Sequence, residues 1–371
     1  MTSSFARTTK RLLVALFAVA LVAAACGDDD EGGGSAACET GVTDGALQIY
    51  NWAEYIDEEQ LARAEEELGI DITMDTYDSN EAMQPIIANG NSGFDLIVPS
   101  DYMVGIMIAA GNIQALNKDA IPNLSNISAD FAGLVYDPDG DYSVPYQWGT
   151  TGIGVDTAVV GTDFPRSWSL VFDPEVSGEF DGSISLLNDP RETLGAALKY
   201  LGYSLNTTDQ DELNEARDLV SATKDRLAAF DTDQADELLT SGVTAIGHGY
   251  SGDMFTQFLE TDDPSQYVYF VPEEGGTRWI DNMAIPFDAP NPCSAHAFIN
   301  WLLDGENGAE LSNWNYYGTP NEAAIPSLDE DLNSFLLDPA VIVGGVESLE
   351  SIQDQGDFEP NYSDAFDEAR S

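Results

Sequence analysis

The stretch LQIYNWAEYIDEEQLARAEEELGIDITMDTY, residues 47–77, contains the pattern that decides the fold. Its first four residues alternate apolar and polar side chains, as a half-buried strand does. Asp57 is a suitable N-cap for a helix with apolar positions on one face, and Gly69 ends that helix. Alternation returns at residues 70–77 and predicts a second strand. This order predicts a βαβ unit, and therefore a parallel sheet flanked by helices.

The same pattern continues along the chain. Further strands are predicted at residues 94–98, 183–187, 243–246, 267–271 and 279–285, and further helices at 189–201, 210–229, 232–240, 293–303 and 361–370. We see no repeat, coiled coil or internal transmembrane run. The economical interpretation is two α/β lobes. In open α/β sheets ligands bind beyond the carboxyl ends of strands, so residues at strand ends are the candidates for function.

The composition excludes several classes of protein. The 371 residues include 66 Asp and Glu but 13 Lys and Arg, whereas binding to nucleic acids or anionic membranes needs clustered cations. Disorder is excluded because 43% of the residues are hydrophobic and 10% aromatic, enough for a sizeable core. Two His and three Cys exclude His-rich or Cys-rich metal clusters, and we predict neither a metal nor a cofactor. Most of the acids are interpreted as a solvated surface adapted to salt.

The N-terminus predicts export. Residues 1–25 begin with basic side chains and continue as an apolar run too short for a comfortable membrane span. The run ends in Ala23-Ala24-Ala25-Cys26, which resembles a bacterial lipoprotein signal in which the Cys becomes the lipidated N-terminus. We therefore predict a cleaved signal at 1–25, lipidation of Cys26 and a flexible tether to residue 44. The alternative is an ordinary signal peptide with an incidental Cys.

Two further cysteines, Cys38 and Cys293, remain in what would be an oxidising compartment. A disulfide between them is the favoured interpretation, and two unpaired buried thiols are the alternative.

Aromatic and acidic side chains gather at the predicted strand ends. They occur at Trp52-Ala53-Glu54-Tyr55, at Ser100-Asp101-Tyr102 and at Trp279-Ile280-Asp281, while another strand end carries Asp189 and Glu192. Aromatic faces beside carboxylates suit an organic cation, because the rings attract it and cover its methylene groups while the carboxylates pair with its ammonium groups. A core aromatic next to a surface acid is the alternative for any single pair.

At these residues the chain resembles the bacterial periplasmic spermidine/putrescine-binding proteins, the receptors of polyamine ABC importers. The matching stretches are YNWAEYI (50–56), DTYDSNEAM (75–83), FDLIVPSDY (94–102), LSNI (124–127), DYSVPYQWGTTGIGV (141–155), LGYSLNTTD (201–209), EEGGTRWIDNMAIP (273–286) and YGTPNEAA (317–324). Together and in this order they are highly specific.

The resemblance implies a type II two-lobe clamshell, each lobe a central mixed sheet flanked by helices. Lobe 1 would comprise residues 45–149 and 282–325, and lobe 2 residues 150–281 and 326–371. Both Cys38 and Cys293 would then lie on lobe 1, as a disulfide requires.

The family's ligand-binding residues transfer to positions of this sequence one by one. They are Trp52, Glu54, Tyr55, Ser100, Tyr102, Asp189, Glu192, Trp279, Asp281 and Tyr317, with Gln353 placed by a poor alignment. Two departures concern ligand identity. Ala53 stands where Thr or Ser is common, and His248 stands where a Trp is expected, so that Tyr250 is a candidate to replace that ring.

The resemblance therefore predicts a lipid-anchored, monomeric receptor at the cell surface or in the periplasm. It would capture a polyamine, with spermidine favoured over putrescine, and deliver it to an ABC permease and ATPase without catalysing a reaction. Four transferred acids suit a triamine better than a diamine. One alternative is a receptor for another organic cation or a small amide-bearing solute. The alternative from another class is a secreted hydrolase that uses a carboxylate pair.

Overall fold

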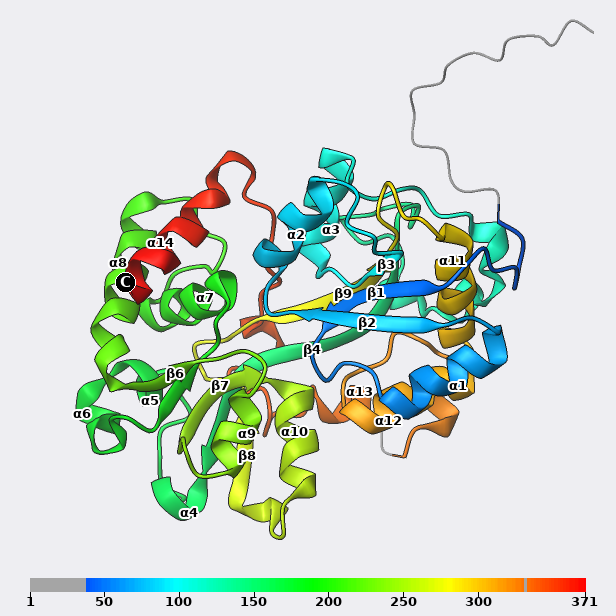
Figure 1. Cartoon of the computed structure of the whole chain (residues 1–371). Helices are drawn as coiled ribbons and strands as arrows, with labels where there is room; N and C mark the ends of the chain where they lie inside the picture. Colours follow the sequence, from blue (N-terminus) through cyan, green and yellow to red (C-terminus); the bar gives the residue numbers. More distant parts are fainter. Residues whose placement is uncertain (1–37, 330–331) are drawn as a thin grey trace, which may run out of the picture. The chain divides into compact units, whose positions relative to one another are not determined.

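The structure is a computed structural model that describes residues 38–329 and 332–371 (Figure 1). The predicted signal peptide, Cys26 and the first part of the predicted tether lie outside the described residues. No helix in the described ranges is long and apolar enough to cross a membrane.

Helices and strands alternate along most of the chain. The strands are β1 (Leu47–Trp52), β2 (Ile72–Tyr77), β3 (Leu96–Ile97), β4 (Ser143–Asp156), β5 (Ile184–Leu186), β6 (Leu227–Phe230), β7 (Ile246–Tyr250), β8 (Tyr267–Phe270) and β9 (Arg278–Ala284). The α-helices are α1 (Glu58–Leu68), α2 (Asn80–Ala88), α3 (Asp101–Ala110), α4 (Thr157–Val160), α5 (Ser169–Phe172), α6 (Pro174–Ser177), α7 (Pro190–Leu201), α8 (Gln210–Thr223), α9 (Ala235–Thr240), α10 (Ser251–Glu260), α11 (Pro292–Leu302), α12 (Gly305–Asn315), α13 (Leu332–Phe335) and α14 (Pro360–Arg370).

The predicted βαβ unit is confirmed. β1 and β2 pair in parallel, with Leu47 opposite Ile72. Between them α1 begins after Asp57, whose side chain accepts a hydrogen bond from the Glu59 N–H, and ends at Gly69 in the left-handed conformation.

All the strands of the described residues form one mixed sheet in which β4 takes part twice. The strand order is β2-β1-β3-β9-β4-β7-β5-β6, and β8 also pairs with β4. Residues 143–150 of β4 pair with β9, whereas residues 151–156 pair with β7 and β8. β4 therefore runs from one half of the sheet into the other (Figure 1), which agrees with the predicted two-lobe α/β fold. The predicted lobe boundaries stay a prediction, which the change of partners near residue 150 supports.

Each half of the sheet has its own apolar core. Around β1 and β9 the core includes Ile49 and Met283 packed with Phe298 of α11. Around β5 and β7 it includes Ile184 and Leu198, the latter from α7. The cores hold the strand ends at which the candidate ligand residues lie.

Two strands were missed by the sequence prediction, and one was misplaced. β4 contains three glycines that lower its strand propensity, and Gly149 is explained only by tertiary packing, since a Cβ there would lie 2.6 Å from Cζ2 of Trp279. β6 follows α8 within the range predicted as one helix, because a short apolar run does not distinguish helix from strand. β7 begins at Ile246, later than predicted.

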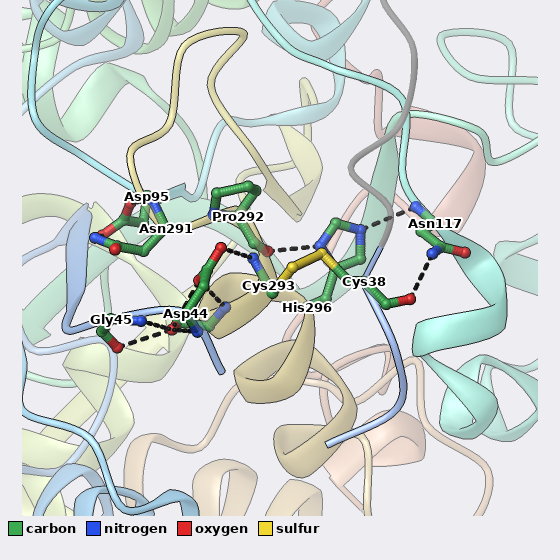
Figure 2. Close-up of a disulfide and its surroundings, with 10 residues drawn as sticks. Cys38, Asp44, Gly45, Asp95, Asn117, Asn291, Pro292, Cys293 and His296 are labelled. Atoms are coloured by element: carbon green, nitrogen blue, oxygen red, sulfur yellow. Dashed lines mark hydrogen bonds between the residues drawn. A yellow bond between two sulfur atoms is a disulfide. The ribbon is translucent and has the colours of Figure 1, made fainter. Parts of the chain in front are cut away.

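A disulfide joins Cys38 to Cys293 at the start of α11 (Figure 2), as the sequence analysis favoured. The segment around it is also held by hydrogen bonds. Asp44 accepts from the N–H groups of Cys293 and Ser294, so that it caps α11 from a distant part of the chain. The backbone carbonyl of Cys38 accepts from the side chain of Asn117. The disulfide thus closes a set of contacts that fixes the beginning of the described chain to α11 and to Asn117.

Candidate functional site: an acidic cavity with aromatic walls

One cavity collects strand ends and helix N-termini from both halves of the sheet. It is lined by Trp52, Ala53, Glu54, Tyr55, Asn80, Ser100, Asp101, Tyr102, Asp189, Glu192, Thr232, Asp233, Tyr250, Asp253, Trp279, Asp281, Tyr317 and Ile352. Seven of these residues are acidic, and none is basic. The position agrees with the rule that α/β sheets bind ligands beyond the carboxyl ends of their strands.

All but two of the predicted ligand residues lie in this lining. The exceptions are His248 and Gln353. That the others meet in one cavity is a finding of the structure, while their roles in binding stay predictions.

Asp281 of β9 is held by hydroxyl groups from two other elements. The Tyr55 hydroxyl donates to one carboxylate oxygen at 2.9 Å, and the Ser100 hydroxyl donates to the other at 2.7 Å. The Asn80 side chain in turn donates to the Ser100 hydroxyl. Burial raises the pKa of Asp281 to about 7, although both hydroxyl donors lower it. An ammonium group placed beside this carboxylate would restore its negative charge.

Asp189 and Glu192 lie at the N-terminus of α7. Asp189 is the N-cap and accepts from the N–H groups of Arg191 and Glu192, each at 2.9 Å. Glu192 accepts from the hydroxyls of Thr151 at 3.0 Å and Thr277 at 2.8 Å. Burial raises the pKa of Glu192 to about 7, and burial together with Glu81 raises that of Asp189. Hydrogen bonds therefore orient both carboxyl groups, and neither forms an ion pair within the described residues.

The aromatic side chains of the lining meet edge to face. The Tyr55 and Tyr317 ring centres are 5.1 Å apart, those of Trp279 and Tyr317 5.2 Å, and those of Tyr250 and Trp279 5.9 Å, with interplanar angles of 85°, 65° and 86°. Perpendicular packing leaves ring faces to cover alkyl chains and to attract cations.

The sequence analysis missed three acids of the lining, Asp101, Asp233 and Asp253. Asp253 accepts a 2.6 Å hydrogen bond from the Tyr317 hydroxyl, and burial and nearby Asp236 raise its pKa. It lies one helical turn after Tyr250, so a helix predicted at Ser251 would have indicated it.

The other two missed acids depend on local conformation or on distant contacts. In an extended chain alternate residues share a face, so the sequence pattern pairs Ser100 with Tyr102 and leaves Asp101 out. The structure instead begins α3 at this residue. Asp233 lies between β6 and α9, within the range 232–240 that the sequence pattern predicts as a helix. The missed polar and apolar members of the lining, Asn80, Thr232 and Ile352, have no signal in the sequence.

His248 is not a cavity residue, contrary to the prediction. Its ring is buried, packs edge-on against Trp168 at 5.1 Å, and has no hydrogen-bond partner at either nitrogen. Burial lowers its pKa to about 3, so the ring is neutral near pH 7 and behaves as an aromatic core residue. Tyr250, two residues later on the same strand, lines the cavity instead.

Gln353 is also placed outside the cavity. Its side chain is exposed, and its backbone carbonyl accepts from Arg191 at 3.3 Å. The neighbouring Ile352 supplies the lining at this point.

The neutral state of His248 predicts acid sensitivity. Its folded-state pKa lies below the ordinary value, so the unfolded chain binds more protons and stability is lost as pH falls from about 6.5 toward 3. Between pH 7 and 4.5 the wild type should lose about 2–3 kcal/mol more unfolding free energy than His248→Phe, measured by urea titration. Both proteins have the same carboxylates, so the effect of their protonation on the unfolding free energy cancels in this comparison. Identical losses would show that His248 is not neutral and buried.

The fold and the cavity define a class: two-lobe proteins that hold a small solute between strand ends. The chain belongs to the family of bacterial extracellular solute-binding proteins, which matches residues 59–333. The family description is of binding proteins and not of enzymes.

Individual relatives are similar over most of their length. The chain is 36% identical to the putrescine/cadaverine-binding protein of Pseudomonas aeruginosa over 294 residues, 78% of this chain and 83% of the relative. It is 35% identical to the spermidine/putrescine-binding periplasmic protein of Escherichia coli over 290 residues, 78% and 81% of the two chains. Among solved structures, a putative spermidine/putrescine ABC transporter protein from Listeria monocytogenes matches with a TM-score of 0.80 at 33% identity, covering 88% of this chain and 99% of that one.

Proposed function

We propose that this protein is an extracytoplasmic receptor that binds a polyamine in the acidic cavity and delivers it to an ABC permease. The observation that carries the proposal is the combination of seven carboxyl groups with edge-packed aromatic rings in one cavity that lacks a basic lining residue. Ammonium groups separated by methylene chains match this lining, since the acids pair with the nitrogens and the rings cover the carbons. The polyamine-binding relatives support the same ligand class.

Within this class we propose that spermidine is preferred over putrescine. The acids occur in two groups, one with Glu54, Asp233 and Asp253, and the other around Asp189, Glu192 and Asp281. Seven carboxyl groups accommodate three ammonium groups better than two, because each buried carboxylate that gains an ammonium partner is relieved of the cost of an unpaired buried charge.

Attachment to the membrane through a lipidated Cys26 is part of the proposal. The lipid anchor rests on the signal in the sequence. The division into two lobes, with boundaries near residues 149 and 281, is also part of the proposal. Metabolic labelling with a fatty acid, in the wild type and in Cys26→Ser, tests the anchor.

Titration calorimetry of residues 38–371 with spermidine, putrescine and glycine betaine tests the ligand. The titrations are repeated at low and high salt, because exposed acids attract any cation at low salt. Tighter binding of spermidine than of putrescine in both salts supports the proposal. No heat with either polyamine would refute it, and binding of betaine alone would indicate a different organic cation.

Binding should depend on pH because Asp281 and Glu192 have pKa values raised to about 7. A bound polycation favours their ionised forms, so binding releases protons and affinity rises with pH. Between pH 6 and 8, where alkylammonium groups stay charged, we expect at least a tenfold gain in affinity. Calorimetry in buffers of different ionisation enthalpy measures the released protons. A pH-independent affinity without proton release would show that binding does not ionise Asp281 and Glu192.

A further inference from the structure

Arg191 is a buried cation beside the acidic cavity. It follows the N-cap Asp189 and precedes Glu192, yet it does not itself line the cavity, and its side chain is 0% exposed. The guanidinium forms an ion pair with Glu359 just before α14, and it donates to the Asn206 side chain at 3.1 Å. A second contact, to the backbone carbonyl of Gln353, ties it to the segment that carries Ile352 into the lining.

The sign of this charge is unexpected for its position. A buried cation next to a cation-binding cavity repels the ligand, and burying it costs desolvation energy. A neutral side chain of similar shape would avoid both costs but would leave Glu359 without its ion-pair partner. The guanidinium is therefore expected to contribute something to the cavity that a neutral group cannot.

The first contribution is a contact between lobes. The guanidinium carbon of Arg191 lies 4.2 Å from the ring centre of Tyr362 and 5.4 Å from that of Tyr102. Tyr102 belongs to lobe 1, lines the cavity and donates its hydroxyl to Glu81 of α2 at 2.7 Å. Arg191 thus lies between a lobe 2 helix and a lobe 1 wall of the cavity, where a planar cation stacks favourably.

The second contribution is electrostatic. Burial raises the pKa values of Glu192 and Glu81, whereas the charge of Arg191 lowers both. The other titratable groups that face Glu192 or Arg191 are Asp101, Asp189, Tyr250, Tyr269, Asp281, Tyr102, Tyr362 and Glu359. The acids of this set that lie in the lining oppose ionisation of Glu192. The hydroxyls of Thr277 and Thr151 counter them first, and Arg191 adds the positive charge that also lowers the pKa of Glu192.

We propose that Arg191 is a positioning residue of the ligand cavity: its buried positive charge offsets the repulsion among the neighbouring acids, and its stack on Tyr102 joins the lobe 2 acids to the lobe 1 wall. The inference rests on the proposed function of this cavity. Arg191, which lies outside the lining, would then contribute to the polyamine affinity and to the pH dependence of that affinity.

Polyamine titrations of Arg191→Gln and Arg191→Lys test the two contributions separately. With Arg191→Gln we expect about tenfold weaker spermidine binding at pH 7 and a shift of the affinity–pH midpoint upward by about one pH unit. Arg191→Lys keeps the charge but loses the planar stack, so its midpoint should stay near that of the wild type while its affinity remains reduced. If Arg191→Gln does not fold, the unchanged midpoint and lowered affinity of Arg191→Lys decide the question.

Arg226 provides the matched control. It is a buried arginine in the same lobe, paired with Asp181 at 2.6 Å and remote from the cavity lining. Arg226→Gln should lower stability but leave spermidine affinity within twofold. Equal loss of affinity in Arg226→Gln and Arg191→Gln, or unchanged affinity and midpoint in Arg191→Gln, would overturn the inference.

A double-mutant cycle tests Arg191 without any ligand. Urea unfolding measures the free energy of unfolding of Arg191→Gln, Glu192→Gln and the double variant. At pH 8 the double variant should lose less unfolding free energy than the sum of the losses in the two single variants. At pH 5.5, where Glu192 is protonated, the losses should become additive. Additivity at both pH values would overturn the electrostatic part, whereas a wild type that binds no polyamine would count against the proposed function alone.

Discussion

Replacing Asp281 by asparagine is expected to weaken spermidine binding by about thirtyfold, or roughly 2 kcal/mol. The substitution keeps the shape of the side chain and removes the charge at the point where two hydroxyl groups hold it. Charge-assisted hydrogen bonds in a buried site contribute more than neutral ones, because water does not screen them. Calorimetry at high salt measures the effect with long-range attraction suppressed.

Asp137→Asn is the matched control for this variant. Asp137 is also buried, and accepts from the backbone N–H groups of Tyr142 and Ser143, but it does not line the cavity. Its replacement should lower stability and leave affinity within about twofold. If Asp281→Asn binds spermidine as tightly as the wild type, the carboxylate does not contact an ammonium group.

Removing the disulfide should cost about 2–5 kcal/mol of unfolding free energy. Cys38 and Cys293 are 255 positions apart, so the bond closes a loop that contains most of the described chain. A cross-link over so long a loop restricts the unfolded chain strongly, and typical natural disulfides contribute amounts of this size. Urea unfolding of the Cys38→Ser/Cys293→Ser variant measures the loss.

Two comparisons separate the bond from the rest of the segment. A reductant should destabilise the wild type and leave the double serine variant unchanged, because only the wild type has a bond to reduce. Spermidine affinity should stay within about twofold, since neither cysteine lines the cavity. Equal stability of wild type and variant would show that the contacts of Asp44 and Asn117 hold the segment without the bond.

The sequence prediction succeeded where local rules act alone. Helix α1 begins after Asp57 and ends at Gly69 as predicted, because capping involves hydrogen bonds between neighbours in the sequence. It failed at β4, whose glycines lower strand propensity and are explained by the close approach of Trp279, Phe270 and Met254, which leaves no room for a side chain. Such contacts join residues far apart in the chain, so no local pattern reports them.

The candidate site shows the same division. Trp52, Asp189 and Asp281 were identified because each carries suitable chemistry at a predicted strand end or in a matching motif. Asp253 and Asp233 were missed because their place in the cavity depends on how α10 and β6 pack against distant elements. His248 was carried over as a position of the family's ligand set, and the resemblance does not report that its ring packs against Trp168 outside the lining.

The sequence by itself determined the α/β class, the family and the acidic and aromatic character of the site. These follow from periodicity, motifs and residue chemistry, which are properties of the chain before it folds. Only the tertiary structure decided which acids meet in one cavity, that His248 is neutral in the core, and that Arg191 lies against Tyr102. Burial and distance set the charge state of a side chain, and both exist only once separate segments are packed together.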